Sequence, residues 1–354
     1  MSGKQARERL APEVFELPVD RIRDGFYSDA YFNHARATLL ASGSHPRVLM
    51  QVFQRKHAIL CGIDEAIAVL ELCSHGWDSL DVRALHDGDA IEPWETVLTI
   101  EGDYTLLAHL ETVYLGVLAR RTLVATNVRR VVEAANGKDI LYFPARHDHF
   151  AVQPGDGYAA HTGGVAGVST DAQASLWGGR GIGTIPHALI AAYDRDTVRA
   201  ATEFVRWAPP AMNIVVLVDF ENASARTALE VARALGPRLW GVRLDTAGDL
   251  VDRTLGDEHD PALRGVNEQL VRAVRGALDE EGYDDVRIVV SGGFDAERIR
   301  AFEERGVPVD AYGVGSSLIR GENDFTADVV LTDGRPAAKV GRHFRPSPRL
   351  ERVR

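Results

Sequence analysis

The sequence contains little cysteine and no long apolar run, and both absences limit what the protein can be. Only two cysteines, Cys61 and Cys73, occur among 354 residues, and neither lies in a C-x-x-C pattern. They exclude a cysteine-based zinc site and indicate a reducing, cytoplasmic setting. No stretch reaches the roughly 18 uninterrupted apolar residues of a membrane span, and the opening "MSGKQARERLAPEVFELPVD" has no apolar core of signal-peptide length. We therefore expect no export signal and no membrane anchor.

An excess of positive charge is also absent. The chain has 40 Lys and Arg against 51 Asp and Glu, a formal net charge of -11. This balance argues against a general binder of nucleic acid or of membrane surfaces, although an acidic enzyme can still focus a local positive patch on an anionic substrate. With 45% hydrophobic and 26% charged residues, the composition is that of a globular protein with one large or two moderate domains.

The first part of the chain mixes helical and extended patterns. "HAILCGIDEAIAVLELC", which holds both cysteines, has a helical pattern, whereas "EPWETVLTIEGDY" (92–104) alternates apolar and polar residues as a strand does. In residues 109–135 apolar residues recur at spacings of three and four, which predicts one long helix or two consecutive ones. This part therefore predicts a mixed α+β unit.

From about residue 139, short apolar runs alternate with helix-like segments. The runs are "GGVAGVS", "GIGTI", "NIVVLVDF", "LWGVRLD", "VRIVVSGG" and "VDAYGVGSS". This alternation predicts βα units around a parallel sheet, and at least six units favour an irregular barrel over a small open sheet. Asp333-Gly334 predicts a hairpin that returns to the first unit, and the basic residues 341–354 are expected to be loose or packed against a neighbour.

Polar residues and glycines stand where each predicted strand of the barrel ends. In a parallel βα architecture these ends emerge on one rim, where such folds place catalysis. The residues are Thr184 and His187 after "GIG", Asp219 after "VVLV", Arg243 and Asp245 around "RLD", Ser291-Gly292-Gly293 after "RIVV", and Gly313 to Ser317 in "GVGSS".

Each of these residues also has a plain structural interpretation. A Gly pair such as Gly292-Gly293 most often only permits a tight turn, but together with "GVGSS" one unit later it favours a phosphate cradle. Asp245 can hold ribose hydroxyls or Mg²⁺ waters beside a phosphate-binding Arg243. We expect Asp249 to have a structural role at the start of the following helix, as an N-cap or a first-turn acid. His187, before a predicted helix, is either a reagent or a cap.

The ordered motifs resemble the type II phosphoribosyltransferases, and among them nicotinate phosphoribosyltransferase. The resemblance runs over nearly the whole chain, through "FYSDAYF", "EPWETVLTIEGDY", "LARRTLVATNVRRVV", "YFPARHDHF", "GGVAGVSTDAQA", "GTIPHALI", "VRLDTAGDL", "SGGFD" and "VDAYGVGSSL". It implies an irregular βα barrel joined to an α/β sandwich domain. We place the sandwich at residues 1–115 plus 325–354 and the barrel at residues 116–324. It also implies a homodimer or larger homo-oligomer with active sites shared between subunits.

The reaction implied joins the ring nitrogen of nicotinate to C1 of 5-phosphoribosyl pyrophosphate, releasing pyrophosphate, with Mg²⁺ and with ATP as co-substrate. By resemblance, His187 is the histidine that ATP phosphorylates, and Asp245 is the second catalytic residue. Arg146 is the partner of the nicotinate carboxylate, Ser169 lies near the base, and Tyr31 stacks on the ring from the adjacent subunit. The phosphate and ribose positions are Thr184, Arg243, Gly292, Gly293, Gly315 and Ser316.

Three positions depart from the family pattern. His147 stands where many members have a second arginine, Thr170 where asparagine is common, and Ala188 where a serine is frequent. Two alternatives therefore stay open. One is a relative that acts on quinolinate, which needs more basic residues, or on nicotinamide, which favours an acid such as Asp171. The other is a non-catalytic sensor of phosphoribosyl ligands. We predict no zinc and no metal bound by the protein alone.

Overall fold

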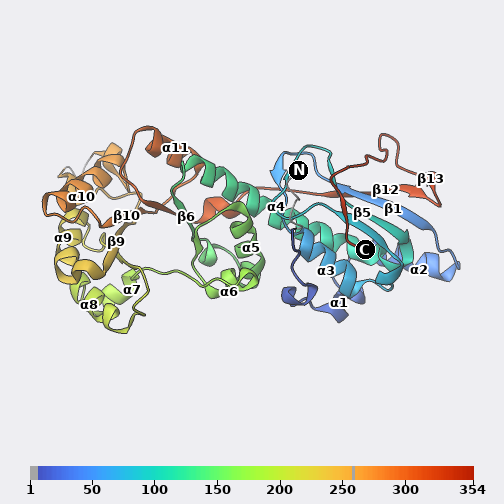
Figure 1. The fold of residues 1–354 in the computed structure, drawn as a ribbon, viewed down its shortest axis with the longest axis horizontal. Coiled ribbons are helices and arrows are strands. Elements are labelled where there is room, and N and C mark those ends of the chain that lie inside the picture. Colours follow the sequence, from blue (N-terminus) through green and yellow to red (C-terminus); the bar gives the residue numbers. More distant parts are fainter. Residues whose placement is uncertain (1–6, 257–259) are drawn as a thin grey trace, which may run out of the picture. The chain divides into compact units, whose positions relative to one another are not determined.

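The structure is a computed structural model that describes residues 7–256 and 260–354, and the chain folds into two compact units. One unit comprises Met1–Thr126, Tyr158–Gly163 and Gly321–Arg354, and the other comprises Asn127–Gly157 and Gly164–Arg320. We call the first the sandwich unit and the second the barrel unit (Figure 1). No helix in the described ranges is both long and apolar enough to cross a membrane.

The sandwich unit is built on an antiparallel sheet with the strand order β13-β12-β1-β5-β3-β14. Its central strand β1 pairs antiparallel with both β5 and β12. The bounds are β1 Arg47–Phe53, β3 Asp81–Ala84, β5 Thr96–Asp103, β12 Thr326–Thr332, β13 Arg335–Pro336 and β14 Glu351–Arg352, and a small separate pair joins β2 Ala58–Ile59 to β4 Ala90–Ile91. The strand predicted within 92–104 is thus confirmed as β5.

The predicted hairpin at Asp333-Gly334 is also confirmed. Both residues have positive φ angles, 50° and 75°, and they join β12 to β13. Glycine adopts this left-handed backbone at no steric cost, and aspartate is among the residues that tolerate it best. Because β12 pairs with β1, the chain does return here to its first unit.

Helices cover one face of the antiparallel sheet. The helices are α1 Val19–Arg23, α2 Ala30–Ala41, α3 Ile63–Cys73 and α4 Glu111–Ala134. Alternate residues of β1, Val48, Met50 and Val52, are buried in one core with apolar residues of α3 and with Tyr114 and Leu118 of α4. The long helix predicted within 109–135 is confirmed as the single helix α4.

The helical prediction around the cysteines was only half right. Cys73 ends α3, but Cys61 lies before it in a buried turn, bonded through its main chain to Thr122. Gly62 interrupts the helical pattern because its φ of 92° lies in the left-handed region and a Cβ there would lie 2.9 Å from the Arg121 side chain. The helix therefore begins only at Ile63.

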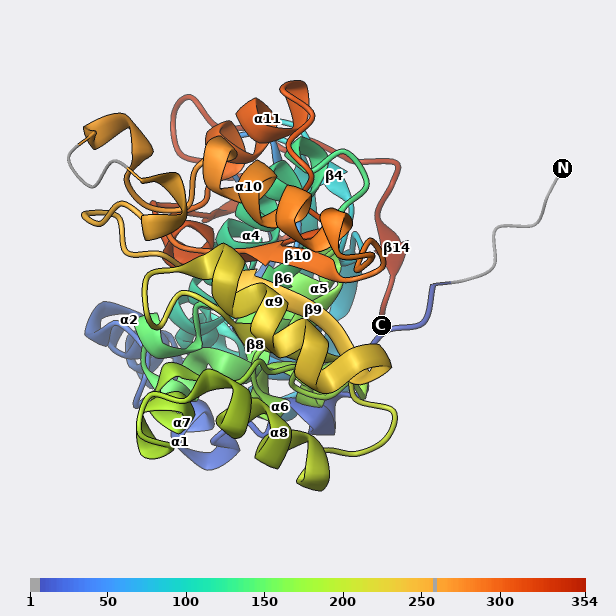
Figure 2. The ribbon, with the colours of Figure 1, turned by 90° about the vertical axis from the view of Figure 1, so that its left-hand side faces the viewer.

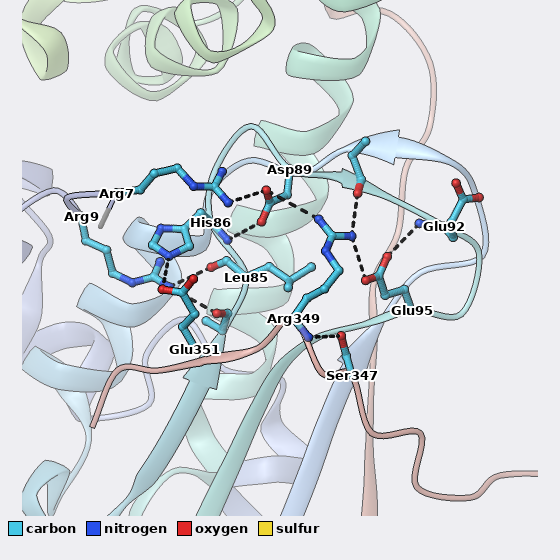
Figure 3. Close-up of polar contacts among 12 residues, drawn as sticks. Arg7, Arg9, Leu85, His86, Asp89, Glu92, Glu95, Ser347, Arg349 and Glu351 are labelled. Atoms are coloured by element: carbon cyan, nitrogen blue, oxygen red, sulfur yellow. Dashed lines mark hydrogen bonds and ion pairs between the residues drawn. The ribbon is translucent and has the colours of Figure 1, made fainter. Parts of the chain in front are cut away.

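Ion pairs hold the last residues of the chain against the stretch between β3 and β5, on both sides of β4 (Figure 3). Arg349 pairs with Glu95 at 2.9 Å, and Glu351 contacts the buried His86 at 3.0 Å. The strand β14 pairs antiparallel with β3 at Ala84 and Arg83. The end of the basic C-terminal segment, expected from the sequence to be loose or packed against a neighbour, is therefore packed against its own sandwich unit.

The barrel unit contains a parallel sheet with the strand order β7-β6-β11-β10-β9-β8. The bounds are β6 Asp139–Tyr142, β7 Gly167–Val168, β8 Ile214–Leu217, β9 Leu239–Leu244, β10 Arg287–Val290 and β11 Ala311–Val314. The segment 181–185 connects the two edges of this sheet, because Gly181 forms a parallel bridge to Val168 of β7 and Ile185 forms one to Val216 of β8. The predicted irregular βα barrel is confirmed.

Helices lie outside the strands of the barrel unit, and α8, α9 and α10 pack side by side (Figure 2). The helices wholly within this unit are α6 Asp171–Ala174, α7 His187–Ala192, α8 Thr197–Trp207, α9 Ser224–Leu235, α10 Glu268–Glu280 and α11 Ala296–Glu304, whereas α5 Gln153–Gly163 begins in this unit and its residues 158–163 count with the sandwich unit. Asp196, Asn267 and Asp295 cap α8, α10 and α11 by accepting main-chain N–H bonds. These caps therefore fix the residue at which each of the three helices begins.

Candidate active site

Arg243 lies at the centre of the polar rim and is held on three sides. Its Nε donates to Ser291 Oγ at 2.8 Å, Nη1 donates to Thr184 Oγ1 at 3.2 Å, and Nη2 contacts Asp245 Oδ2 at 3.2 Å. Ser291 follows β10, Asp245 follows β9, and Thr184 lies within the closing segment 181–185. The barrel topology thus brings together residues that are more than a hundred positions apart in the sequence.

The face of the Arg243 guanidinium lies over an aromatic ring. Its Cζ is 5.0 Å from the centre of the Phe143 ring, a distance at which a cation is attracted to the ring face. The ring fits because position 313 is glycine: a Cβ on Gly313 would lie 2.6 Å from Phe143 Cε2. Phe143 follows β6 and Gly313 lies in β11, so two neighbouring strands build this support.

His187 is paired with a carboxylate and is not a helix cap. It is the first residue of α7, whose N-cap is Pro186, and its Nε2 lies 3.1 Å from Asp219 Oδ1. The hydrogen bond that the imidazole donates to Asp219 raises the pKa of His187 above its ordinary value, and partial burial opposes that shift. The His187 side chain is 44% exposed, whereas that of Asp219 is only 7% exposed. The imidazole can therefore meet a ligand while Asp219 orients it.

Two glycine loops lie on the same rim. Gly292 and Gly293 have φ angles of 88° and 74°, so both occupy the left-handed region that L side chains rarely adopt. Arg298 fixes this loop by donating from Nη1 to the main-chain oxygen of Gly292 at 2.7 Å. Gly315 and Ser316 follow β11, and a Cβ on Gly315 would lie 3.2 Å from the His147 ring. Both loops offer main-chain N–H groups without bulky side chains.

Arg146 and Ser169 follow β6 and β7, the next strands of the same sheet. Arg146 lies in the short 3-10 helix Ala145–His147 and is exposed. Ser169 donates from Oγ to Gln173 Oε1 at 3.1 Å, and Thr170 forms a reciprocal capping box with Gln173 at the start of α6. The loop after β7 is therefore fixed by Gln173, whose side chain is buried.

Tyr31 lies in the sandwich unit, on the first turn of α2. The side chain is 62% exposed, and its hydroxyl lies 3.4 Å from Asp29 Oδ2. None of the described residues of α2 is buried. Tyr31 is therefore exposed in this chain, whereas the neighbouring Phe32 is half-buried.

The structure connects some of the predicted residues directly and leaves others on nearby loops. Thr184, Arg243 and Asp245 form one hydrogen-bonded network. Besides the hydrogen bond to Asp219, the charges of Asp219 and Asp245 raise the pKa of His187, and that of Arg243 lowers it. Sequence reasoning gave no role to Phe143 or to the hydroxyl of Ser291. Ser291 carried a signal, because it ends a strand beside the Gly pair, but nothing in the sequence marked Phe143.

Within residues 7–256 and 260–354, no group of three or more His, Cys, Asp or Glu side chains is placed to hold a metal ion. Asp219 and Asp245 still offer carboxylate oxygens on the rim, which are the ligands that Mg²⁺ prefers. Two carboxylates suit an ion that takes its other ligands from water and from a phosphorylated substrate. The residues therefore fit a Mg²⁺ ion that arrives with its ligand.

The chain is similar to known proteins in sequence. Residues 29–122 match the family model of the quinolinate phosphoribosyl transferase N-terminal domain. A nicotinate phosphoribosyltransferase of Mycobacterium tuberculosis is 32% identical over 268 residues, covering 73% of this chain and 55% of that protein. A nicotinate phosphoribosyltransferase of Bacillus subtilis is 24% identical, covering 83% of this chain and 63% of that protein. The chain thus spans about half the length of the curated relatives it matches.

Solved structures resemble both the fold and the sequence. The nicotinate-nucleotide pyrophosphorylase of Pyrococcus furiosus is 32% identical with a TM-score of 0.80, covering 96% of this chain and 82% of that one. Human nicotinic acid phosphoribosyltransferase shares the fold, with a TM-score of 0.65 at 18% identity over 88% of this chain and 76% of that one. The barrel, its rim and the separate antiparallel sheet are those of the type II phosphoribosyltransferase class. The chain belongs to this class, and within it the chain is similar both to nicotinate phosphoribosyltransferases and to a nicotinate-nucleotide pyrophosphorylase.

Proposed function

We propose that the protein is a nicotinate phosphoribosyltransferase of NAD salvage. It joins nicotinate to 5-phosphoribosyl pyrophosphate and forms nicotinate mononucleotide and pyrophosphate. The observation that carries this proposal is the network around Arg243, which fixes a guanidinium between two glycine loops on one rim. A fixed guanidinium flanked by bare main-chain N–H groups suits a phosphorylated sugar.

The reaction breaks the bond from ribose C1 to a pyrophosphate oxygen and forms a bond from C1 to the ring nitrogen of nicotinate. The ribose ring passes through an oxocarbenium-like state, so the site has to stabilise the leaving pyrophosphate and to seat the attacking nitrogen. Arg243 and the loops at Gly292-Gly293 and Gly315-Ser316 hold phosphate. Asp245 and Thr184 lie beside Arg243, where they can orient the ribose.

Mg²⁺ is the proposed cofactor, and it neutralises charge on the pyrophosphate when bound. Asp245 and Asp219 are the residues that would hold it on the rim, through water and substrate oxygens. Asp245 accepts a hydrogen bond from Ser291 on Oδ1 and one from Arg243 on Oδ2, so these bonds set the position of its carboxylate before a ligand binds.

His187 is the proposed acceptor of a phosphoryl group from ATP. Its imidazole is exposed enough to react, and Asp219 on Nε2 leaves Nδ1 as the nitrogen that can attack the γ-phosphorus. The step forms an N–P bond, breaks the bond from that phosphorus to the bridging oxygen and releases ADP. ATP coupling of this kind favours product formation.

Arg146 is the proposed partner of the nicotinate carboxylate, since a planar guanidinium can donate to both of its oxygens. The match of residues 29–122 to a quinolinate family model supports quinolinate as the second candidate base. A dimer or larger homo-oligomer with shared sites, in which Tyr31 stacks on the ring, is also proposed, and the exposure of α2 supports it.

Changing Arg146 to Ala tests the choice of base. We expect the KM for nicotinate to rise by about tenfold or more, because a lost charge-assisted hydrogen bond costs roughly that factor. The KM for 5-phosphoribosyl pyrophosphate should stay within about twofold. Arg146→Lys is the matched control, since it keeps the charge but loses the planar fork, and it should fall in between. Equal rises in both KM values would contradict the carboxylate role.

Changing His187 to Ala tests the coupling to ATP. We expect the variant to lose both the stimulation by ATP and any labelled phosphohistidine, and to keep basal turnover. The measurement is incorporation of ³²P from γ-labelled ATP, with His161→Ala, an exposed histidine elsewhere in the chain, as the control. A labelled phosphoprotein that persists in His187→Ala would place the phosphoryl group on another residue.

A further inference from the structure

Ser291 is a buried hydroxyl between the two charged groups of the rim. Ser291 is only 3% exposed, and its Oγ accepts a hydrogen bond from Arg243 Nε at 2.8 Å. The same Oγ lies 2.6 Å from Asp245 Oδ1, the length of a strong bond from a hydroxyl to a carboxylate. Ser291 therefore links the guanidinium to the carboxylate.

The one proton of the Ser291 hydroxyl is used in a hydrogen bond inside the protein. A hydroxyl has one proton to donate, and Oγ lies near two acceptors, Asp245 Oδ1 at 2.6 Å and Leu244 O at 3.2 Å. The carboxylate is the nearer and the charged acceptor, so it takes the proton. With that proton committed and one lone pair taken by Arg243, Ser291 has no donor left for a ligand.

Arg243, in contrast, keeps donors for a ligand. A guanidinium has five N–H groups, and the contacts to Ser291, Thr184 and Asp245 use one on each of its three nitrogens. Two N–H groups remain, one on each terminal nitrogen. Such a pair can donate in parallel to two oxygens of one phosphate. The Nε bond to Ser291 and the Phe143 ring, 5.0 Å from Cζ, together restrict the position of the guanidinium.

We infer that Ser291 is a positioning residue for the phosphorylated ligand: it limits Arg243 and Asp245 to the single contact from Nη2 to Oδ2 at 3.2 Å, so that the guanidinium can meet a phosphate instead of forming a bidentate pair with the carboxylate. This inference rests on the proposed function, since it names the phosphoribosyl pyrophosphate side of that site. Without the hydroxyl, Arg243 Nε and Asp245 Oδ1 lose their common partner, and a direct bidentate pair becomes available to them. The pair would consume the donors that the ligand needs.

The test is direct binding of 5-phosphoribosyl pyrophosphate with Mg²⁺ by isothermal titration calorimetry, using the full chain. We expect Ser291→Ala and Ser291→Cys to raise the Kd about tenfold, the factor expected when a hydrogen bond to a charged group is lost. Ser291→Thr keeps the hydroxyl and should recover a large part of the affinity. Ser42→Ala, which removes an exposed hydroxyl of the sandwich unit, is the matched control and should bind like the wild type.

A turnover assay on the same variants separates positioning from a general loss of structure. We expect the KM for 5-phosphoribosyl pyrophosphate to rise with the Kd, while the KM for nicotinate and the melting temperature of the variants change little. Binding by Ser291→Ala within about twofold of the wild type would overturn the inference. So would equal rises in both KM values.

The same assay keeps this inference apart from the proposed function. A wild-type chain that binds 5-phosphoribosyl pyrophosphate but makes no nicotinate mononucleotide would contradict the proposed function, and the calorimetric comparison would still decide on Ser291. A wild-type chain that binds no 5-phosphoribosyl pyrophosphate would overturn both.

Discussion

At the scale of single residues, two acidic side chains of the sandwich unit have unusual protonation. Burial, reinforced by the charge of Asp64, raises the pKa of Asp87 to about 7. Burial, together with the charges of Asp328 and Asp29, likewise raises the pKa of Glu111 to about 7. Asp87 also accepts from the main-chain N–H of Ile63 at 2.8 Å and so caps α3. The fold thus favours the protonated form of two carboxyl groups.

This protonation predicts a pH dependence of stability. A group whose pKa is raised in the folded state contributes stability at low pH and loses it as the pH rises through the folded pKa, here about 7. We expect the part of the unfolding free energy due to these two groups to fall between pH 5 and pH 8. Asp87→Asn keeps the capping oxygen without the charge, so it should reduce this fall, and Glu111→Gln should do the same.

Urea denaturation of the full chain at four pH values between 5 and 8 measures this effect. Asp284→Asn, at an exposed acid, is the control and should follow the wild type. A wild-type chain whose stability rises from pH 5 to pH 8, with both variants parallel to it, would contradict the assignment.

The residues of the site could be predicted only where the sequence marks the end of a strand. Thr184, Arg243 and Asp245 follow apolar runs, and the structure brings them together. Phe143 has no such mark, because its role depends on a space left by Gly313 in another strand. The prediction for Asp249 was wrong, since the next helix is the short 3-10 helix Arg253–Leu255, which Asp252 caps, and Asn267 caps the next α-helix, α10. Capping depends on where the chain next becomes regular, which a local pattern does not fix.

At the scale of elements, β14 is too short to be held by its own main-chain pairing alone, and side-chain contacts help to hold it. It has only two residues, yet beside it the N–H of Val353 donates to Val82 O and the N–H of Val82 donates to Arg354 O, and Glu351 pairs with His86. The hydrogen bond from His86 lowers the pKa of Glu351, so this contribution to stability is present at neutral pH and is lost as the pH falls through the lowered pKa of Glu351.

Changing Glu351 to Gln tests this attachment. We expect the amide of Val353 to exchange with solvent severalfold faster, because β14 opens more often once the ion pair is removed. Hydrogen–deuterium exchange followed by mass spectrometry measures it. Glu13→Gln, at an exposed acid near the other end of the chain, is the control. Unchanged exchange at Val353 would mean that main-chain pairing alone holds the strand.

Elements with a strong period could be predicted well, and irregular ones could not. The long helix α4, the strand β5 and the hairpin at Asp333-Gly334 all follow from local spacing and turn chemistry. Two bridges at Gly181 and Ile185 close the barrel, and they leave no periodic signal in the sequence. Such a contact depends on the packing of distant strands, so only the structure reveals it.

At the scale of the whole molecule, the proposed shared sites predict complementation between inactive variants. Tyr31→Ala removes the ring offered to a partner subunit, and Arg243→Ala disables the subunit's own phosphate site. In a mixed dimer, one site then has both an intact Tyr31 and an intact Arg243. Random mixing should restore about a quarter of wild-type activity, since about half the dimers are mixed and each has one intact site.

The measurement is turnover after the two variants are unfolded and refolded together, with each variant refolded alone as the control. Activity no greater than the sum of the separate variants would contradict sharing of the site. A verified monomer with full activity would do so as well.

The central claim is that this rim joins nicotinate to a phosphoribosyl group, and a product assay by mass spectrometry tests it most directly. The purified chain is given 5-phosphoribosyl pyrophosphate and Mg²⁺ with nicotinate, nicotinamide or quinolinate, each with and without ATP. We predict nicotinate mononucleotide from nicotinate, formed faster with ATP, and little product from the other two bases. Efficient product from quinolinate or nicotinamide instead, or no product from any base, would contradict the account.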